Sequence, residues 1–423
     1  MADSRIANTW RCGVYPGNAM TDVGGEPAGL ARLPRFETLE IRATPMVIVA
    51  SLAVPLGVRA EENVAGFALA RLPRFACTLT GGTNRHRIDV PPAQACSNSG
   101  SGVSQRLRNI FPEMMTAKLV LFGGSGFVGS NLLKHLKNDV VAPSEFEADL
   151  TKIDSLRAVI GRGDVVINAA GYANATDRTA KGRELFRSVN VEGLRNLAEA
   201  CAQEGAAQLV HISSVAAMGR WQGEGISEDM MRPVDSPYAA SKLEGEKLLG
   251  QFADTIPITI LRPTSVFGEG RGLAATLCSL VRKGVVPLPR GGRARIPFTY
   301  VGNVAHAVSL AVGNERCFGR TFIIGDETSY PLRDVVSALA KGMGMRARIV
   351  AVPYPIWYAA AVGFEIMARL RGTAPLLDRG RLDTMTLSVS YSIEPFRQAT
   401  GYAPPFGLEE AAERIAAWYL GRG

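Results

Sequence analysis

The sequence lacks the residue clusters that hold metal ions or disulfides. Its six cysteines are far apart and form no CxxC pair, and its four histidines are equally scattered. Zinc sites and disulfide frameworks both need such residues at short, regular spacings. We therefore predict no metal and no disulfide framework, and unpaired cysteines suit a reducing compartment such as the cytoplasm.

Long runs of one kind of residue are also missing. The net charge of +8 is spread over 423 residues without a run of five basic residues, so nucleic acid is not an expected partner. The apolar run Pro45–Val58 is broken by Pro55, and it is too short to span a membrane. It also lies too far from the N-terminus for a secretion signal. The composition, 47% hydrophobic and 20% charged, is that of a globular enzyme.

Residues 1–115 differ in composition from the rest of the chain. They contain twelve arginines and no lysine, and Lys118 is the first lysine. Segments rich in glycine, serine and asparagine show no hydrophobic periodicity, so we expect an extension with little stable structure. Two explanations stay open. The extension is either an over-long translation start, since Met114 and Met115 precede the first core strand, or a targeting or regulatory arm.

A strand, a glycine turn and a helix follow one another from Lys118. The apolar run KLVLF leads into GGSGFVG and then into a segment with helical periodicity. Gly123 permits a tight turn, Gly126 lets the backbone approach a pyrophosphate, and Gly129 lets the helix pack closely. Free N–H groups at the helix start favour phosphate. The other cofactor contacts expected in this turn are Ser125, Phe127 and Val128.

Segments with the character of strands then alternate with helical patterns. Residues 139–144, 164–171 and 208–214 are expected strands. This alternation predicts an α/β fold with a doubly wound parallel sheet, in which ligands bind at the carboxyl ends of the strands. The expected cofactor contacts at these strand ends are Ala169, Ala170, Gly171 and Ser213.

The end of the second strand indicates which dinucleotide binds. An acid there suits the ribose of NAD, whereas arginine or lysine would pair with the 2′-phosphate of NADP. No arginine or lysine occurs from Asn138 to Thr151, and the stretch carries Glu145, Glu147 and Asp149. The predicted cofactor is therefore NAD, with NADP as the alternative.

The segment SPYAASK at 236–242 predicts the start of a helix. Ser236 suits the N-cap and Pro237 the first helical position, which puts Tyr238 and Lys242 one turn apart. An ammonium beside a phenol favours the phenolate and lowers the tyrosine pKa, so that the phenol exchanges a proton with an alcohol or ketone. Taken alone, YxxxK is also a chance pattern in amphipathic helices.

Together with the glycine turn, NAAG and a strand that ends at Ser214, this helix makes residues 118–423 resemble the extended short-chain dehydrogenase/reductase family. That family includes nucleotide-sugar epimerases and reductases and 3β-hydroxysteroid dehydrogenases. The resemblance implies Tyr238 as acid or base, Lys242 as the residue that holds the ribose, and Ser214 as partner of the reacting oxygen. The further cofactor contacts that it implies are Asp149, Leu150, Asn190, Pro263 and Val266.

The expected organisation has three parts. Residues 116–262 form a Rossmann domain, and residues 263–423 form mainly a smaller, partly helical substrate lobe with some segments returning to the sheet. Residues 1–115 precede them.

Dehydratases of the family carry acids directly after the catalytic serine or threonine, where this chain has Val215, Ala216 and Ala217. Oxidation, reduction or 4-epimerisation are therefore expected, and dehydration is not.

Three hypotheses about function stay open, two of which name a substrate. A nucleotide sugar is the first, with Arg293 and Arg295 as candidates to clamp its diphosphate, unless they belong to a solvated basic loop. The segment FTYVGNVAHA at 298–307 resembles the hydroxysteroid branch, so a sterol-like alcohol is the alternative. An alternative of another class is a non-catalytic dinucleotide-sensing or accessory protein.

Residues 354–371 are almost wholly apolar. They suit a lipophilic pocket, a packed core or a membrane surface, and core packing is the default expectation. Contact with a membrane is not expected. The expected partner is a small-molecule substrate, and a homodimer is left open.

Overall fold

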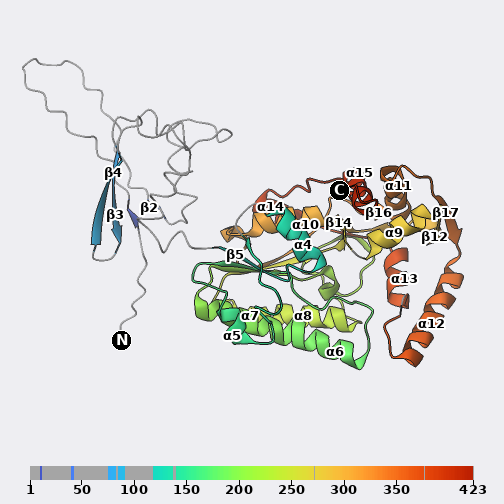
Figure 1. The fold of residues 1–423 in the computed structure, drawn as a ribbon, viewed down its shortest axis with the longest axis horizontal. Helices are drawn as coiled ribbons and strands as arrows, with labels where there is room; N and C mark the ends of the chain where they lie inside the picture. Colours follow the sequence, from blue (N-terminus) through green and yellow to red (C-terminus); the bar gives the residue numbers. More distant parts are fainter. Residues whose placement is uncertain are drawn as a thin grey trace, which may run out of the picture. The chain divides into compact units, whose positions relative to one another are not determined.

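The computed structural model describes four short strands before residue 118, and residues 118–423 apart from 137–139, 271, 376 and 423. β1 (Trp10–Arg11) pairs antiparallel with β2 (Glu40–Ile41), and β3 (Phe75–Gly81) pairs antiparallel with β4 (Asn84–Val90). The rest of the N-terminal extension, for which we expected little stable structure, lies outside the described residues. A second unit, Thr116–Gly423, carries everything that follows (Figure 1).

A parallel sheet of six strands forms the centre of this unit. The strand order is β15-β10-β8-β7-β5-β6, and every neighbouring pair is parallel. The predicted α/β class and the strands expected at 118–122, 139–144, 164–171 and 208–214 are confirmed. The strands are β5 (Leu119–Phe122), β6 (Val140–Val141), β7 (Val165–Asn168), β8 (Gln208–Ile212), β10 (Ile258–Pro263) and β15 (Arg320–Ile324).

The strand order reverses beside β5, because β6 lies on one side of it and β7 on the other. Ligands of doubly wound sheets bind at such a reversal, at the carboxyl ends of the strands. Every residue of β8 and β10 is buried, as expected for parallel strands covered on both faces. The fold therefore points to the loops after β5, β7, β8 and β10.

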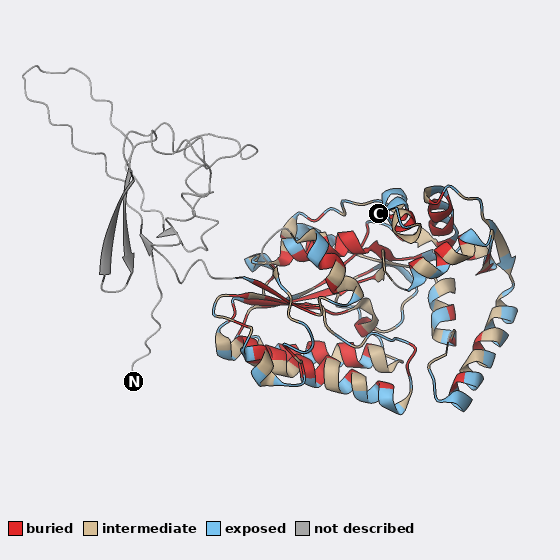
Figure 2. Cartoon of the chain, viewed as in Figure 1, coloured by how far each residue is buried: buried red, intermediate tan, exposed pale blue. Residues whose placement is uncertain are grey.

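Helices cover both faces of the sheet, with their buried sides turned toward it (Figure 2). One face carries α4 (Phe127–His135), α10 (Val301–Ala311) and α14 (Glu394–Thr400) (Figure 1). The other carries α5 (Ile153–Arg157), α6 (Ala180–Arg187), α7 (Gly193–Glu204) and α8 (Pro237–Leu249). A π-helical turn, η4 (Ser188–Glu192), joins α6 to α7. The shorter 3₁₀ turns are η5 (Val215–Met218), η6 (Gly250–Phe252), η7 (Arg290–Gly292) and η8 (Glu315–Cys317).

Residues after β10, together with the earlier strand β9, build a second layer of short strand pairs and helices. Its strand pairs are β11 (Ser265–Phe267) with β14 (Phe298–Tyr300), β12 (Val285–Pro289) with β17 (Arg348–Val352), β13 (Arg295–Ile296) with β16 (Tyr330–Pro331), and β9 (Gly223–Ile226) with β18 (Val389–Tyr391). Its helices are α9 (Leu273–Arg282), α11 (Leu332–Gly342), α12 (Tyr354–Arg371), α13 (Arg379–Thr386) and α15 (Leu408–Tyr419).

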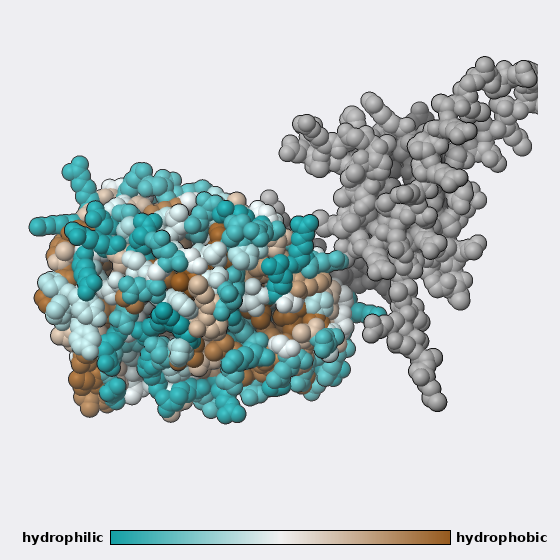
Figure 3. Space-filling model, turned by 180° about the vertical axis from the view of Figure 1, so that it is seen from behind, coloured by the Kyte–Doolittle hydropathy of each residue, from teal (hydrophilic) through white to brown (hydrophobic). Residues whose placement is uncertain are grey.

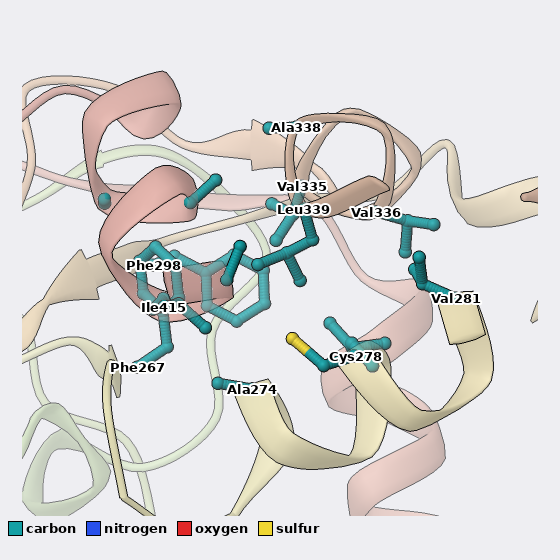
Figure 4. Close-up of a cluster of buried hydrophobic side chains, with 14 of the residues drawn as sticks. Phe267, Ala274, Cys278, Val281, Phe298, Val335, Val336, Ala338, Leu339 and Ile415 are labelled. Atoms are coloured by element: carbon teal, nitrogen blue, oxygen red, sulfur yellow. The ribbon is translucent and has the colours of Figure 1, made fainter. Parts of the chain in front are cut away.

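A hydrophobic core joins α9, α11 and α15 to β11 and β14. Phe267, Phe298, Cys278, Leu339 and Ile415 meet there, and all are buried (Figure 4). β15 returns from this half of the chain to the edge of the main sheet, beside β10. The role of residues 263–423 in binding substrate stays a prediction.

The apolar segment 354–371 forms α12, and the expectation that it packs as core is wrong. Only Ala361 and Ala368 of its eighteen residues are buried. The helix contacts α13 on one side, and its other side faces away from the described residues (Figures 1 and 2). In the described part of the chain, no helix has the length and apolar character needed to cross a membrane.

Candidate active site

The glycine turn between β5 and α4 excludes side chains at two positions. Gly123 has a φ of +81°, and a Cβ there would lie 2.4 Å from the backbone nitrogen of Ala170. A Cβ on Gly129 would lie 2.0 Å from the carbonyl oxygen of Gly123. Neither clash can be relieved by rotating a side chain, because both partners are backbone atoms. The turn therefore holds the loops after β5 and β7 in close contact.

The start of α4 offers unused hydrogen-bond donors. Gly126 is its N-cap and provides no side-chain cap, and no acidic residue stands in the first turn. Such a helix start combines free N–H groups with the positive end of the helix dipole. The turn thus fits the diphosphate of a dinucleotide, as its glycine pattern predicted.

A cavity of about 230 Å³ opens beside this turn. Ten of the residues predicted to bind cofactor lie in its wall, together with Ser214. Ala173, Ile212 and Thr264 also lie there and were missed, although each stands within two residues of a predicted one. The lining residues are Phe127, Val128, Ala169, Ala170, Gly171, Ala173, Ile212, Ser213, Ser214, Tyr238, Lys242, Pro263, Thr264 and Val266.

The helix α8 presents the tyrosine and lysine to this cavity. Ser236 caps it by accepting a hydrogen bond from the backbone N–H of Ala239 at 3.1 Å, and Pro237 occupies the first turn. Both features were predicted and are confirmed. Tyr238 and Ser214 both line the cavity, close enough for Ser214 to lower the pKa of the phenol, and the Lys242 Nζ donates to the carbonyl oxygen of Ile212 at 3.1 Å.

A third residue on the same face of α8, Glu246, was missed by sequence reasoning. The Ser213 hydroxyl donates to its carboxylate. Arg262 pairs with it through Nη2 and Oε2 at 2.7 Å, and both side chains are less than 10% exposed. Positions 238, 242 and 246 continue a four-residue spacing, which is the signal that could have found it. The consecutive residues Ile212 and Ser213 therefore each hydrogen bond with one turn of α8, and Ser214 lies near a third at Tyr238.

Asn190 lies behind the cavity wall, in the π-helical turn η4. Its Nδ2 donates to the carbonyl of Tyr172 at 3.0 Å and to the Ser241 hydroxyl at 2.9 Å. Its Oδ1 accepts from the backbone N–H of Tyr172 at 2.8 Å. Asn190 thus ties the loop after β7 to α8. It is not among the lining residues, so its predicted contact with the cofactor stays a prediction.

Asp149 and Leu150 are the other predicted contacts outside the cavity wall. The Asp149 carboxylate accepts hydrogen bonds from the backbone N–H and hydroxyl of Thr151, at 2.9 and 2.7 Å. It also pairs with Lys152 at 3.4 Å. Leu150 packs in the core beneath. Their contact with an adenine stays a prediction, as do the contacts of Gly123, Ser125, Gly126 and Gly129.

Burial shifts the pKa values of Tyr238 and Lys242, and the shift of Tyr238 is opposite to the expected one. Burial raises the pKa of Tyr238 above its usual value of 10, and only the interaction with Ser214 opposes this rise. Burial also lowers the pKa of Lys242 to about 8, against the attraction of Glu246. The predicted fall of the Tyr238 pKa is therefore not found, because desolvation of the phenolate outweighs any effect of the neighbouring lysine. At neutral pH the phenol keeps its proton.

The arginines expected to clamp a diphosphate lie elsewhere. Arg293 and Arg295 are exposed, and neither is among the residues that line the cavity. Arg295 stands on β13 beside Ile296, which is buried, and successive side chains of a strand point to opposite faces. The arrangement leaves both arginines at the surface, which fits the alternative of a solvated basic loop.

Comparisons with known proteins identify the family that this chain matches and several of its relatives. The model of the NAD dependent epimerase/dehydratase family matches residues 119–325. UDP-glucose 4-epimerase from Vibrio cholerae is 27% identical over 330 residues, 72% of this chain and 96% of that protein. The 3beta-hydroxysteroid-dehydrogenase/decarboxylase isoform 2 from Arabidopsis thaliana is 28% identical over 290 residues, 63% of this chain and 50% of that protein.

A solved structure shows the same fold. RMD from Pseudomonas aeruginosa, in complex with NADPH, matches with a TM-score of 0.58 and 21% identity, over 73% of this chain and all of that one. The resemblance inferred from the motifs is thus confirmed at the level of the family. Through residues 119–325, the chain belongs to the NAD dependent epimerase/dehydratase family.

Proposed function

We propose that this chain uses NAD to oxidise or reduce a hydroxyl or keto group, or to epimerise such a centre, on a nucleotide sugar. The observation that carries the proposal is the pair of hydroxyls from Tyr238 and Ser214, which lie near each other in the wall of the cavity beside the glycine turn. Two hydroxyls so placed converge on one oxygen atom of a substrate.

The dinucleotide supplies the hydride chemistry when it is bound. The chain supplies proton transfer and position. In reduction the Tyr238 phenol donates its proton to the carbonyl oxygen, while the Ser214 hydroxyl steadies that oxygen. In oxidation the phenol oxygen takes the proton back. Pro263 and Val266 add apolar surface to the wall of the reacting space.

The loop after β6 supports NAD rather than NADP. Hydrogen bonds from Ser144 lower the pKa of Glu147, and hydrogen bonds from Thr151 lower the pKa of Asp149. Both carboxylates therefore stay negative and would repel a 2′-phosphate. Binding of NAD more tightly than NADP, measured by calorimetry on the purified chain, is the expected result.

Replacing Tyr238 with phenylalanine tests the mechanism. Loss of a general acid lowers turnover by about 10²–10⁴-fold. NAD binding should persist, since the ring remains. Tyr419→Phe, on the distant helix α15, is the matched control and should keep full turnover. NADH absorbance and analysis of the sugar products measure the effect, and unchanged turnover of the Tyr238 variant would remove the phenol from the mechanism.

A sterol-like alcohol is the second candidate, and one observation favours it. The cavity wall is mainly apolar, and Arg293 and Arg295 lie outside it. A relative carries hydroxysteroid-dehydrogenase in its name. UDP-glucose and a 3β-hydroxysteroid, offered to the same preparation with NAD, separate the two candidates. If NAD binds and neither these nor related compounds turn over, a dinucleotide-sensing role replaces both.

A further inference from the structure

The outward side of α12 is apolar along its whole length. Eighteen residues at 1.5 Å each make a helix about 27 Å long. Residues three and four apart lie on one side of a helix, and here that side faces away from α13. We call it the apolar face, and its exposed members are Ile356, Ala359, Gly363, Ile366, Met367 and Leu370.

Exposure of this kind is concentrated on α12. Twelve large hydrophobic side chains are exposed among the described residues, and five of them belong to this helix. Leu370 is 84% exposed and Ile356 is 60% exposed. Hydrophobic atoms also gather at the end of the molecule that carries α12 (Figure 3). Single exposed apolar residues are ordinary, but a contiguous stripe marks a surface that another body covers.

The surroundings of the apolar face are basic. Residues 345–386 contain six arginines and three acidic residues. Each acid is already engaged within the chain. Glu365 pairs with Arg379 at 3.0 Å, Asp383 pairs with Arg220, and Asp378 caps α13. Arg369 and Arg371 stand on either side of Leu370, so the end of the apolar face has a positive rim.

We propose that α12 docks on the surface of an anionic lipid bilayer. Its apolar face enters the boundary between headgroups and acyl chains, and the arginines meet lipid phosphates. Arginine stems tolerate this depth because their charged ends reach back to the headgroups. A second copy of the chain fits less well. A symmetric contact would bring together two copies of the same arginine excess, whose acids are already engaged.

Sedimentation of the full chain with vesicles tests the apolar part of the proposal. Vesicles of phosphatidylcholine with phosphatidylglycerol should carry the wild-type protein down, and phosphatidylcholine alone should carry much less. Leu370→Glu combined with Ile366→Glu should weaken binding more than about tenfold, since two large side chains lose their burial. Val141→Glu is the control, because Val141 is also exposed, at 39%, but lies on β6 of the main sheet. It should bind as the wild type does.

A second pair of substitutions tests whether the arginines beside the apolar face contribute to binding of anionic lipid. An arginine close to an anionic surface strengthens binding about fivefold, so Arg369→Gln with Arg371→Gln should lose roughly 25-fold on the anionic vesicles. Binding to phosphatidylcholine alone should not change. Lys181→Gln with Lys247→Gln removes two exposed charges from α6 and α8 and should leave binding intact. Added salt should weaken the wild type more than the arginine variant.

Three results would overturn the proposal. In the first, the wild-type chain sediments with neither kind of vesicle, and in the second, the control variants lose as much binding as the α12 variants. In the third, Leu370→Glu turns a dimer into a monomer by sedimentation velocity while vesicle binding stays the same, which would assign the apolar face to a second copy.

Discussion

The helices α8 and α12 belong to the same unit. Helices usually bury apolar side chains and expose charged ones, and each of these two breaks one half of that rule. α8 buries charge, with Lys242 7% exposed and Glu246 8% exposed. α12 exposes large apolar side chains, with Leu370 at 84%. Either departure costs free energy relative to an ordinary amphipathic helix, so each marks a place where something other than stability determines the residue.

The two helices differ in whether that cost is offset within the chain. On α8 every buried polar group has a partner, since Lys242 donates to Ile212 and Glu246 pairs with Arg262 and Ser213. On α12 the apolar face has no partner among the described residues. We infer that the buried charges of α8 are balanced within the chain, and that the apolar face of α12 needs another surface.

The largest expected effect comes from breaking the buried pair beside α8. Arg262→Met leaves the Glu246 carboxylate buried without its cation, which should lower the free energy of unfolding by about 3–5 kcal/mol. Urea denaturation measures the loss. Arg157→Met is the control, because its pair with Glu204 is exposed and should contribute far less. Equal losses in the two variants would show that burial does not distinguish these pairs.

Neutralising a buried carboxylate that has no cation beside it should raise the stability, whereas removing the cation Arg262 should lower it. Asp326 is 8% exposed, accepts hydrogen bonds from Asn303 and Tyr300, and has a pKa raised by burial to about 6. A raised pKa contributes stability at low pH that is lost as the pH rises through about 6. Asp326→Asn should therefore stabilise the protein by about 1–3 kcal/mol at pH 8.

This gain should fade as the pH falls below about 4, where the wild-type carboxyl is also neutral. Thermal unfolding at both pH values measures the difference. Asp254→Asn, at an exposed position, is the control and should show no such pH dependence. A gain that does not vary with pH would contradict the assignment of the raised pKa.

The pH dependence of turnover should follow the raised pKa of Tyr238. Reduction needs the protonated phenol, which prevails at neutral pH, so its kcat/KM should change little between about pH 6 and pH 7.5. Oxidation needs the phenolate, so its kcat/KM should rise about tenfold per pH unit. Assays in both directions test this, and parallel profiles would contradict it. Above about pH 8, loss of the Lys242 charge should disturb both directions.

The smallest effect is expected on the apolar face. Ile366→Gln should change the free energy of unfolding by no more than about 0.5 kcal/mol, because the side chain is exposed already. Leu339→Ala, in the core shown in Figure 4, should cost about 2–5 kcal/mol. A large loss from Ile366→Gln would mean that the apolar face is buried within the protein, and the contrast with α8 would disappear.

Local signals carried most of the fold and of the site. The glycine turn, the strand ends and the SPYAASK segment each specify their structure within a few residues, and ten of the seventeen residues predicted to bind cofactor line the cavity. What the sequence could not show depends on distant contacts. The Glu246 carboxylate meets Arg262 from another element, and the Tyr238 pKa depends on how deeply the folded chain buries the phenol.

The segment 354–371 is a second case in which distant contacts could not be predicted from the sequence. Its composition predicted burial, because an apolar helix usually finds a core. Whether it finds one depends on the neighbours that the fold supplies, and here they cover only the side of Ala361 and Ala368. Composition identifies an apolar helix, but it does not predict which part of the protein, or which other surface, packs against that helix.

The π-helical turn η4 makes the site sensitive to the number of residues as well as to their kind. A turn of this type holds one residue more than an α-helical turn. Deleting a single residue from Ser188–Glu192 would let α6 and α7 join as one regular helix, and would rotate the preceding part by about 100°. Asn190 would then lose Tyr172 and Ser241 together. A one-residue deletion outside the cavity wall would thus release the loop after β7 from the helix that carries the catalytic pair.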